Sequence, residues 1–195
     1  MGKRKKTWIT WAVMVVIAVA VVVGYFVISS KKNDDNYEAE AVQTEVSKLL
    51  EKNLDSAYPA TPREVVKLYS RIMKCFYNEE LGTKQMEGLT DQLRRLFDAQ
   101  LLDANPRQEH LAELQEEIRS YAAHKRTVTS YQVEAANNVV EWTLDGQEFA
   151  RLIAAYTEKE DTQYLKVYEE FVLRKDAEGK WKIVGWKLAD EEDMQ

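Results

Sequence analysis

Residues 8–28 form the feature that most constrains this chain: twenty-one consecutive uncharged residues, WITWAVMVVIAVAVVVGYFVI. As a helix with a rise of about 1.5 Å per residue, this run is long enough to cross a hydrocarbon core about 30 Å thick. A helix also satisfies its own backbone hydrogen bonds, which lipid cannot do. The run therefore predicts one transmembrane helix, with the lipid bilayer as the partner of residues 8–28.

The flanks of this run predict an orientation. The tail 1–7 carries four basic residues, whereas the far flank soon becomes acidic at Asp34 and Asp35. Because Lys and Arg favour the cytoplasmic side of a membrane, we expect a single-pass plasma-membrane protein with a cytoplasmic N-terminus and an extracytoplasmic C-terminal domain. A cleaved signal peptide is the alternative. The length of the run, with Ala18 and Ala20 followed by further apolar residues, favours an uncleaved anchor.

Charge and cysteine content exclude several classes of protein. The chain has 27 basic and 33 acidic residues, and four of the basic ones precede the apolar run. The remaining acidic part is unsuited to nucleic acid, which requires clustered Lys and Arg. The single cysteine, Cys75, excludes an intramolecular disulfide. Its apolar neighbours indicate a small buried side chain rather than a reactive thiol.

Helical patterns follow a polar stalk. Residues 29–60 are expected to be a stalk or linker, within which apolar residues from Val42 to Leu50 keep helical spacing. In the segment TPRE, Thr61 suits an N-cap, Pro62 suits the first helical position, and Glu64 completes a capping box. We therefore expect a helix over 62–77. Two more helices are expected over 84–103 and 106–124, separated at Asn105–Pro106.

After residue 126 the spacing of apolar residues changes from a helical period to a period of two, as in strands. Strands are expected over 127–135, 139–144, 147–160, 163–176 and 180–188, with Asp145–Gly146 as a tight hairpin turn. Trp181 and Ile183 share one face of the last strand and Trp186 the other, so Gly185 is expected to mark a bulge. Helices followed by antiparallel strands predict an α+β fold with helices packed on one face of a curved sheet.

Two segments resemble a known superfamily. FVLRKDAEGKWKIVGW (171–186) resembles the closing hairpin of the NTF2-like (cystatin-like α+β) superfamily, and TPREVVKLYSRIM (61–73) resembles its first helix. The resemblance implies three or so N-terminal helices on a strongly curved antiparallel sheet over 61–190, a cone that often contains a pocket. An acidic tail, 191–195, follows. The superfamily includes isomerases, dehydratases, transport factors and scaffolds, so it does not determine the chemistry.

No catalytic constellation is evident. His110 and His124 are fourteen residues apart on one expected helix, about 21 Å along its axis, and cannot act together. No Cys/His ligand spacing, phosphate-binding loop or nucleophile elbow is present. We therefore predict no catalytic residues, no metal site and no cofactor.

Glu169 is the one acid on an apolar strand face, between Val167 and Phe171. It either lies inside the cone, with a raised pKa and a ligand contact, or sits at a local bulge or edge. The frequency of bulges near sheet rims favours the second interpretation. Other residues that either line the pocket or pack in the ordinary way on strands are Tyr131, Tyr156, Tyr168 and Trp142.

Three functions are compatible with this layout. A basic tail, one crossing and an exported NTF2-like domain resemble the layout of VirB8-type proteins of secretion and conjugation machines. This favours a non-catalytic interaction or assembly module of the bacterial cell envelope, with an envelope protein or a second copy as partner. A small-ligand binding or sensing domain is the alternative. An isomerase or dehydratase is least favoured, since no acid/base pair is assembled.

Overall fold

Helices precede strands in the described part of the chain, which runs from residue 44 to residue 194 of a computed structural model. The helices are α2 (Glu45–Glu51), α3 (Pro62–Asn78), α4 (Thr83–Arg94), α5 (Ala99–Ala104) and α6 (Arg107–Ala123). The strands are β1 (Arg126–Val133), β2 (Val140–Leu144), β3 (Gln147–Glu160), β4 (Gln163–Lys175) and β5 (Trp181–Ala189). Short 3-10 helices lie at Ala136–Asn138 and Glu191–Met194.

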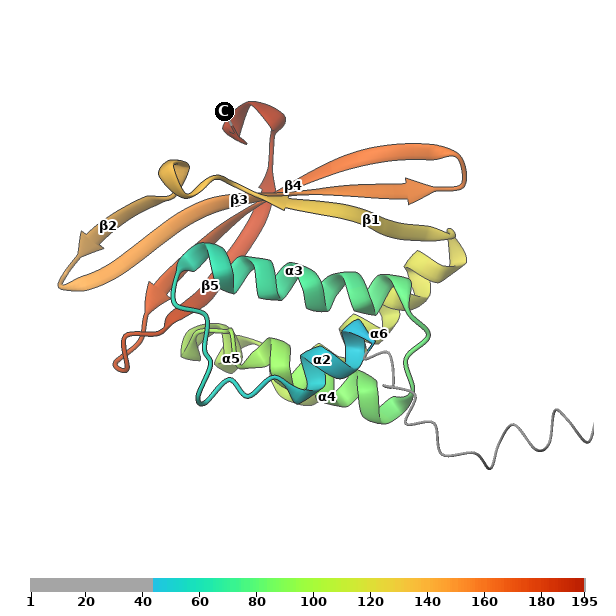
Figure 1. The fold of residues 1–195 in the computed structure, drawn as a ribbon, viewed down its shortest axis with the longest axis horizontal. Coiled ribbons are helices and arrows are strands. Elements are labelled where there is room, and N and C mark those ends of the chain that lie inside the picture. Colours follow the sequence, from blue (N-terminus) through green and yellow to red (C-terminus); the bar gives the residue numbers. More distant parts are fainter. Residues whose placement is uncertain (1–43, 195) are drawn as a thin grey trace, which may run out of the picture. The chain divides into compact units, whose positions relative to one another are not determined.

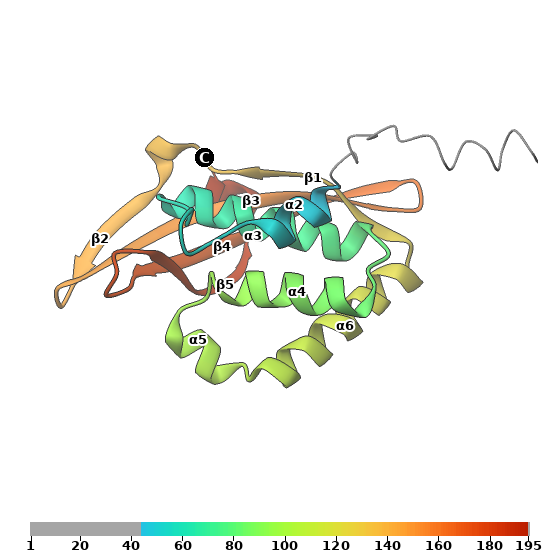
Figure 2. The ribbon, with the colours of Figure 1, turned by 60° about the horizontal axis from the view of Figure 1, so that its bottom comes forward.

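Helix α3 is the centre of the domain. Pro62 is its first residue, and the Thr61 hydroxyl accepts a hydrogen bond from the Glu64 amide at 3.2 Å, so the predicted N-cap is confirmed. The predicted capping box is wrong, because the Glu64 carboxylate accepts from the Ala60 amide, at 3.0 Å, in place of the Thr61 amide. Its buried residues cover most of its circumference and leave one partly exposed polar stripe, which includes Lys67 and Arg71. Figures 1 and 2 show the reason: α3 lies between the sheet and α4. A helix covered on both sides must be apolar around most of its circumference.

The sheet is antiparallel and built around β3 and β4, its two longest strands. One edge of β3 pairs with β4, and its other edge is shared by β2, opposite 147–151, and β1, opposite 154–160. Strand β5 pairs with the second half of β4. In Figure 1, β2 and β1 accordingly diverge toward opposite ends of the sheet. The five strands therefore form one sheet with helices covering one of its faces.

The predicted irregularity near Gly185 is confirmed. Val172 is opposite Gly185 while Leu173 is opposite Ile183, so β5 contains one extra residue at Val184. Ile183 is fully buried, and beyond the bulge the Trp186 ring lies 5.3 Å from that of Tyr69 on α3. The phase switch thus turns residues on both sides of the bulge toward the helices.

The predicted fold class is wrong as a whole, although the described residues do form an α+β domain with a five-stranded antiparallel sheet. It combined about three helices with a transmembrane helix. Within 44–194 there are five α-helices, and no helix there is long and apolar enough to cross a membrane. The longest, α3 and α6, have 17 residues each and carry charged residues, whereas a crossing needs about 20 apolar ones. The predicted span 8–28 lies outside the described residues.

One helix and the start of the core also differ from expectation. The helix expected over 84–103 is interrupted, because the amide of Asp98 donates to the Ile183 carbonyl and the Ile183 amide donates to the Leu96 carbonyl. The chain at 96–98 therefore joins the edge of the sheet, and α5 begins anew with Asp98 as its N-cap. The start of the core is earlier than expected: Leu49 of α2 and Leu54, in the segment assigned to a stalk or linker, are buried in it.

Candidate functional site

A cleft lies between α3, α6 and the helix-facing side of the sheet, and we call it the inner cleft. It consists of two adjoining lobes of about 230 and 260 Å³. The first lobe extends toward α4 and α5, with Phe97 and His110 in its wall, and the second extends toward β1. Five residues line both lobes and so form the middle of the inner cleft: Tyr69, Met73, Tyr77, Glu117 and Glu169.

The part of the cleft wall that α3 contributes is formed by residues at helical spacing. Tyr69, Met73 and Tyr77 follow one another at four-residue intervals, which aligns them on one face of the helix. The Tyr77 hydroxyl donates to Glu117 Oε1 at 2.8 Å, and its ring stacks on Tyr121 with centroids 4.0 Å apart. Burial and the nearby Glu117 carboxylate raise the pKa of Tyr77, so the hydroxyl stays protonated and continues to donate. These contacts join α6 to α3 across the cleft.

Glu169 projects into this space from β4. Its partners are Ala154 on β3 and Leu188 on β5, and the register is unbroken on both sides of it. The alternative of a bulge at Glu169 is therefore wrong. Because strand residues alternate between faces, Glu169 shares the helix-facing side with Phe171, which is fully buried.

A chain of hydroxyl groups supports the Glu169 carboxyl. Glu169 and Tyr156 share a side-chain hydrogen bond. The Tyr156 hydroxyl is in turn 2.8 Å from Ser70 Oγ, which also donates to the Val66 carbonyl at 2.9 Å. Either hydroxyl can be the donor between Ser70 and Tyr156. When Tyr156 donates to Glu169, its hydrogen bond stabilises the carboxylate and lowers the pKa of that group.

The pKa of Glu169 is raised from its ordinary value of 4.5 to about 7. Burial is the main cause, and the charge of Glu117 adds to it, followed by that of Glu158, while the hydrogen bond with Tyr156 acts in the opposite direction. Within 44–194, no Lys, Arg or His forms an ion pair with this carboxyl. The raised pKa therefore brings the titration of Glu169 close to neutral pH.

The side chains that carry a charge in the wall of the first lobe are all acidic. Glu113 and Glu117 of α6 line it together with Glu169, and none of the described residues lining this lobe is a lysine or arginine. Burial and the neighbouring Arg94 lower the pKa of His110, so it is neutral at pH 7. The second lobe does contain a cation, Arg126, which lies 3.8 Å from Glu158. The first lobe is therefore the more electronegative part of the inner cleft.

Apolar side chains are unusually exposed at the mouth of the cleft. Trp186, in the wall of the first lobe, is 39% exposed, and Leu165 and Leu188, in the wall of the second, are 58% and 75% exposed. The Trp186 ring also lies 5.9 Å from that of Phe97. The open end of the cleft thus presents aromatic and aliphatic surface around acidic groups.

Two of the five residues predicted to bind a ligand line the inner cleft, Glu169 and Tyr156. Tyr168 follows Val167 and precedes Glu169, so it lies on the opposite face of the sheet. Tyr131 lines separate surface depressions beside α3. Trp142, on β2, stacks on Phe149 at 5.4 Å and is absent from both walls.

Sequence reasoning missed Tyr69, Tyr77, Glu117 and Trp186. A signal for them does exist in the sequence: a line of Tyr69, Met73 and Tyr77 on α3, and a matching line of Glu113, Glu117 and Tyr121 on α6, both at four-residue spacing. His110 of α6 also contributes to the first lobe. His124 does not, because it is the C-cap of α6, with Nδ1 2.8 Å from the Ser120 carbonyl.

A metal site and a reactive cysteine are less well supported by the described residues. Among residues 44–194, no group of three His, Cys, Asp or Glu side chains is arranged to hold a metal ion. Cys75 is buried, and burial, together with the charges of Glu45 and Glu79, raises the pKa of its thiol to about 11. The thiol therefore stays protonated, consistent with a packing role.

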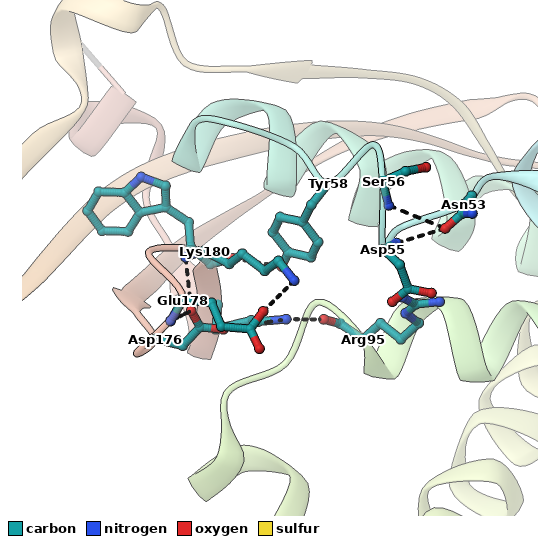
Figure 3. A network of polar contacts seen from close by, with 10 residues as sticks. Asn53, Asp55, Ser56, Tyr58, Arg95, Asp176, Glu178 and Lys180 are labelled. Atoms are coloured by element: carbon teal, nitrogen blue, oxygen red, sulfur yellow. Dashed lines mark hydrogen bonds and ion pairs between the residues drawn. The ribbon is translucent and has the colours of Figure 1, made fainter.

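Figure 3 shows a second polar cluster, which joins the segment between α2 and α3 to the turn between β4 and β5. The Tyr58 hydroxyl donates to the Trp181 carbonyl at 2.8 Å, and Lys182 donates to the Arg95 carbonyl at 2.7 Å. Arg95 also pairs with Asp55, an ion pair that is largely exposed. Exposed pairs contribute about 0–1 kcal/mol each, so this cluster orders the loop rather than forming a ligand site.

No curated protein matches this sequence. A family model does match it, over residues 1–186, and thus over nearly the whole chain. The chain therefore belongs to the family described as Domain of unknown function (DUF6715).

Proposed function

We propose that the inner cleft binds a small organic ligand, with Glu169 as the principal polar contact. The observation that supports this proposal is a carboxyl group without a cationic partner, held on an unbroken strand and directed into a cavity with aromatic walls. Ligand sites typically combine apolar walls with a few fixed polar groups. The two lobes together fall within the range of about 300–1,000 Å³ that such sites have.

The rigidity of the site also supports this function. Glu169 is fixed by the pairing of β4 with both β3 and β5, and Tyr69 is fixed by the central helix. A site on regular elements is preorganised, so little conformational entropy is lost when a ligand binds. The α6 wall is joined to α3 by the contacts of Tyr77 with Glu117 and Tyr121.

Fragment binding followed by NMR tests the proposal. The full-length, 15N-labelled protein is titrated with cationic, neutral and anionic fragments, and the amide of Glu169 and the indole N–H of Trp186 are monitored. We expect at least one class of fragment to shift both signals in a saturable manner. Glu169→Gln should weaken that binding, whereas Glu170→Gln, on the opposite face of the sheet, should not. If no class shifts these signals at millimolar concentration, the proposal fails.

A protein-interaction role is the second candidate. Tyr164, Leu165 and Leu188 are 65%, 58% and 75% exposed, and Leu165 and Leu188 lie together in the wall of the second lobe. Exposed apolar clusters of this kind are typical of interaction surfaces. A photo-crosslinking side chain at position 165 should give one discrete adduct in cells, either with a second copy or with one envelope protein. The same probe at the exposed residue Gln100 of α5 is the control, and equal labelling at both sites would contradict this role.

A further inference from the structure

The composition of the first lobe restricts what it accepts. Three carboxyl groups, those of Glu113, Glu117 and Glu169, lie in its wall, and no described lysine or arginine does. Carboxylates in a cavity with low-dielectric walls concentrate their field, which attracts cations and repels anions. An anionic ligand would be repelled by these carboxylates and would find no cationic side chain in the wall to pair with.

Aromatic rings form much of the remaining wall. Trp186 contacts both Tyr69 and Phe97, and its ring is tilted by 58° to that of Tyr69 at 5.3 Å. The faces of aromatic rings attract cations through their quadrupole, and Trp does so most strongly. Trp186 is partly exposed, so its ring remains available to a ligand at the mouth of the lobe.

The cation is organic rather than a metal ion. Within 44–194 no three acidic, His or Cys side chains are placed to coordinate a metal. Strongly hydrated metal ions require several oxygen ligands at short distances, which this wall does not supply. An ammonium group that carries apolar substituents is weakly hydrated, and it matches a wall of rings and separated carboxyl groups.

We infer that the first lobe binds an organic ammonium ion, with its charge next to Glu169 and Glu117 and its apolar part against Tyr69 and Trp186. This inference rests on the proposed function of the inner cleft and specifies its ligand class. Glu113 and Glu117 are both exposed residues of α6, and Glu113 adds to the negative field of the lobe.

Binding of a cation should be linked to proton release. A cation next to Glu169 favours the carboxylate, so it lowers a pKa that is about 7 in the free protein. Affinity should therefore increase from pH 6 to pH 8 and level off above that. The other ionisable groups facing the carboxyl are Glu117 of α6, Glu158 and Tyr156 of β3, and Tyr69 and Tyr77 of α3. The tyrosines stay neutral because burial raises each pKa, and His110 is already neutral above pH 6.5.

Matched probes test this inference on the full-length protein. Choline, its uncharged isostere 3,3-dimethylbutan-1-ol and the anion benzoate are titrated, with the Trp186 indole signal as the readout. We expect choline to bind about ten-fold more tightly than the isostere, as cation–π and charge contacts of this kind allow. Glu169→Gln and Glu117→Gln should each remove most of that preference, whereas Glu170→Gln should change the affinity by less than about two-fold.

The outcomes separate the two proposals. Equal binding of choline and its isostere, or tighter binding of benzoate, overturns the ammonium inference and leaves a ligand-binding cleft. Choline binding that is unchanged in both Glu169→Gln and Glu117→Gln also overturns it, since the cation would then bind elsewhere. If neither these probes nor the wider fragment set shifts the Trp186 and Glu169 signals, both the inference and the proposed function fail.

Discussion

Glu169 and Glu170 are consecutive residues of β4, yet their surroundings are opposite. Glu170 lies on the face of the sheet away from the helices, where Arg151 approaches to 2.7 Å and Lys187 to 3.2 Å. Glu169 faces the helices, where its neighbours are tyrosines and other acids. The charge of Glu170, whose side chain is 11% exposed, is thus balanced by two cations. A carboxyl without one is kept at an energetic cost, which is typical of functional positions.

A third carboxyl group, that of Asp98, has a purely structural role. Asp98 is buried at the N-terminus of α5, accepts a hydrogen bond from the Gln100 amide and pairs with Arg174, which is five residues beyond Glu169 on β4. Its side chain is 5% exposed. Asp98 and Glu170 are thus paired with cations and stabilise the fold, whereas Glu169 has no cation and remains open to a ligand.

The largest effect is expected at the Asp98 pair. Arg174→Met leaves a buried carboxylate without its cation, so the free energy of unfolding should fall by about 3–5 kcal/mol. Urea unfolding of the full-length protein measures this loss. Arg151→Met is the control on the outer face, where the side chain is 41% exposed, and it should cost less than about 1 kcal/mol. Equal losses would show that the burial of Asp98 does not matter.

The next effect is a pH dependence specific to Glu169. Because its pKa is raised in the folded state, the folded protein holds this proton more tightly than the unfolded chain between pH 4.5 and about 7. The free energy of unfolding should therefore fall as pH rises through that range. Relative to wild type, Glu169→Gln should gain about 2–3 kcal/mol between pH 5 and pH 8.

Urea unfolding at the two pH values measures that difference, since the other titrating groups are common to both proteins. Glu170→Gln is the matched control, and it should show no comparable gain at high pH. A flat difference between Glu169→Gln and wild type would mean that the Glu169 carboxyl is solvated, and would contradict its assignment to the interior of the cleft.

A smaller effect should follow removal of the Tyr156 hydroxyl. Tyr156→Phe deletes the hydrogen bond that lowers the pKa of Glu169, so this pKa should rise above its wild-type value of about 7. The free energy of unfolding should fall by about 1 kcal/mol, because Ser70 keeps its bond to the Val66 carbonyl. NMR titration of the Glu169 side-chain carboxyl carbon measures the pKa. A downward shift would contradict the hydrogen-bond chain.

The smallest effect is expected for Glu170 itself. Glu170→Gln removes the negative charge of a side chain that is 11% exposed, but the two cations that it pairs with, Arg151 and Lys187, are 41% and 72% exposed. The loss in free energy of unfolding should be within about 1 kcal/mol and should shrink as salt is added. Chemical denaturation at low and high ionic strength provides the measurement. A loss larger than that of Arg174→Met would reverse the comparison between the two pairs.

Local signals in the sequence predicted much of the fold. The TPRE cap fixed the start of α3, and Asp145 and Gly146, with φ of 50° and 79°, form the tight turn that this dipeptide favours. The bulge near Gly185 followed from the change of phase along β5. By contrast, the break at 96–98 has no local cause, because it depends on hydrogen bonds to Ile183 about 85 residues away.

The inner cleft was less predictable. Tyr69 and Met73 read as an ordinary core stripe, since helical periodicity shows which residues face inward but not whether they meet atoms or a cavity. The functional hypotheses that rest on residues 1–43, among them the membrane location, stay predictions, as does the NTF2-like resemblance.

The sequence by itself determined the element types, the order of helices before strands and the sidedness of each strand, because these depend on capping, turn chemistry and periodicity within a few residues. Only the tertiary structure decided that Glu169 faces a cavity while Glu170 meets two cations. That difference arises from the register of β4 against β3 and β5 and from the position of α6, which are set by contacts between residues distant in the chain.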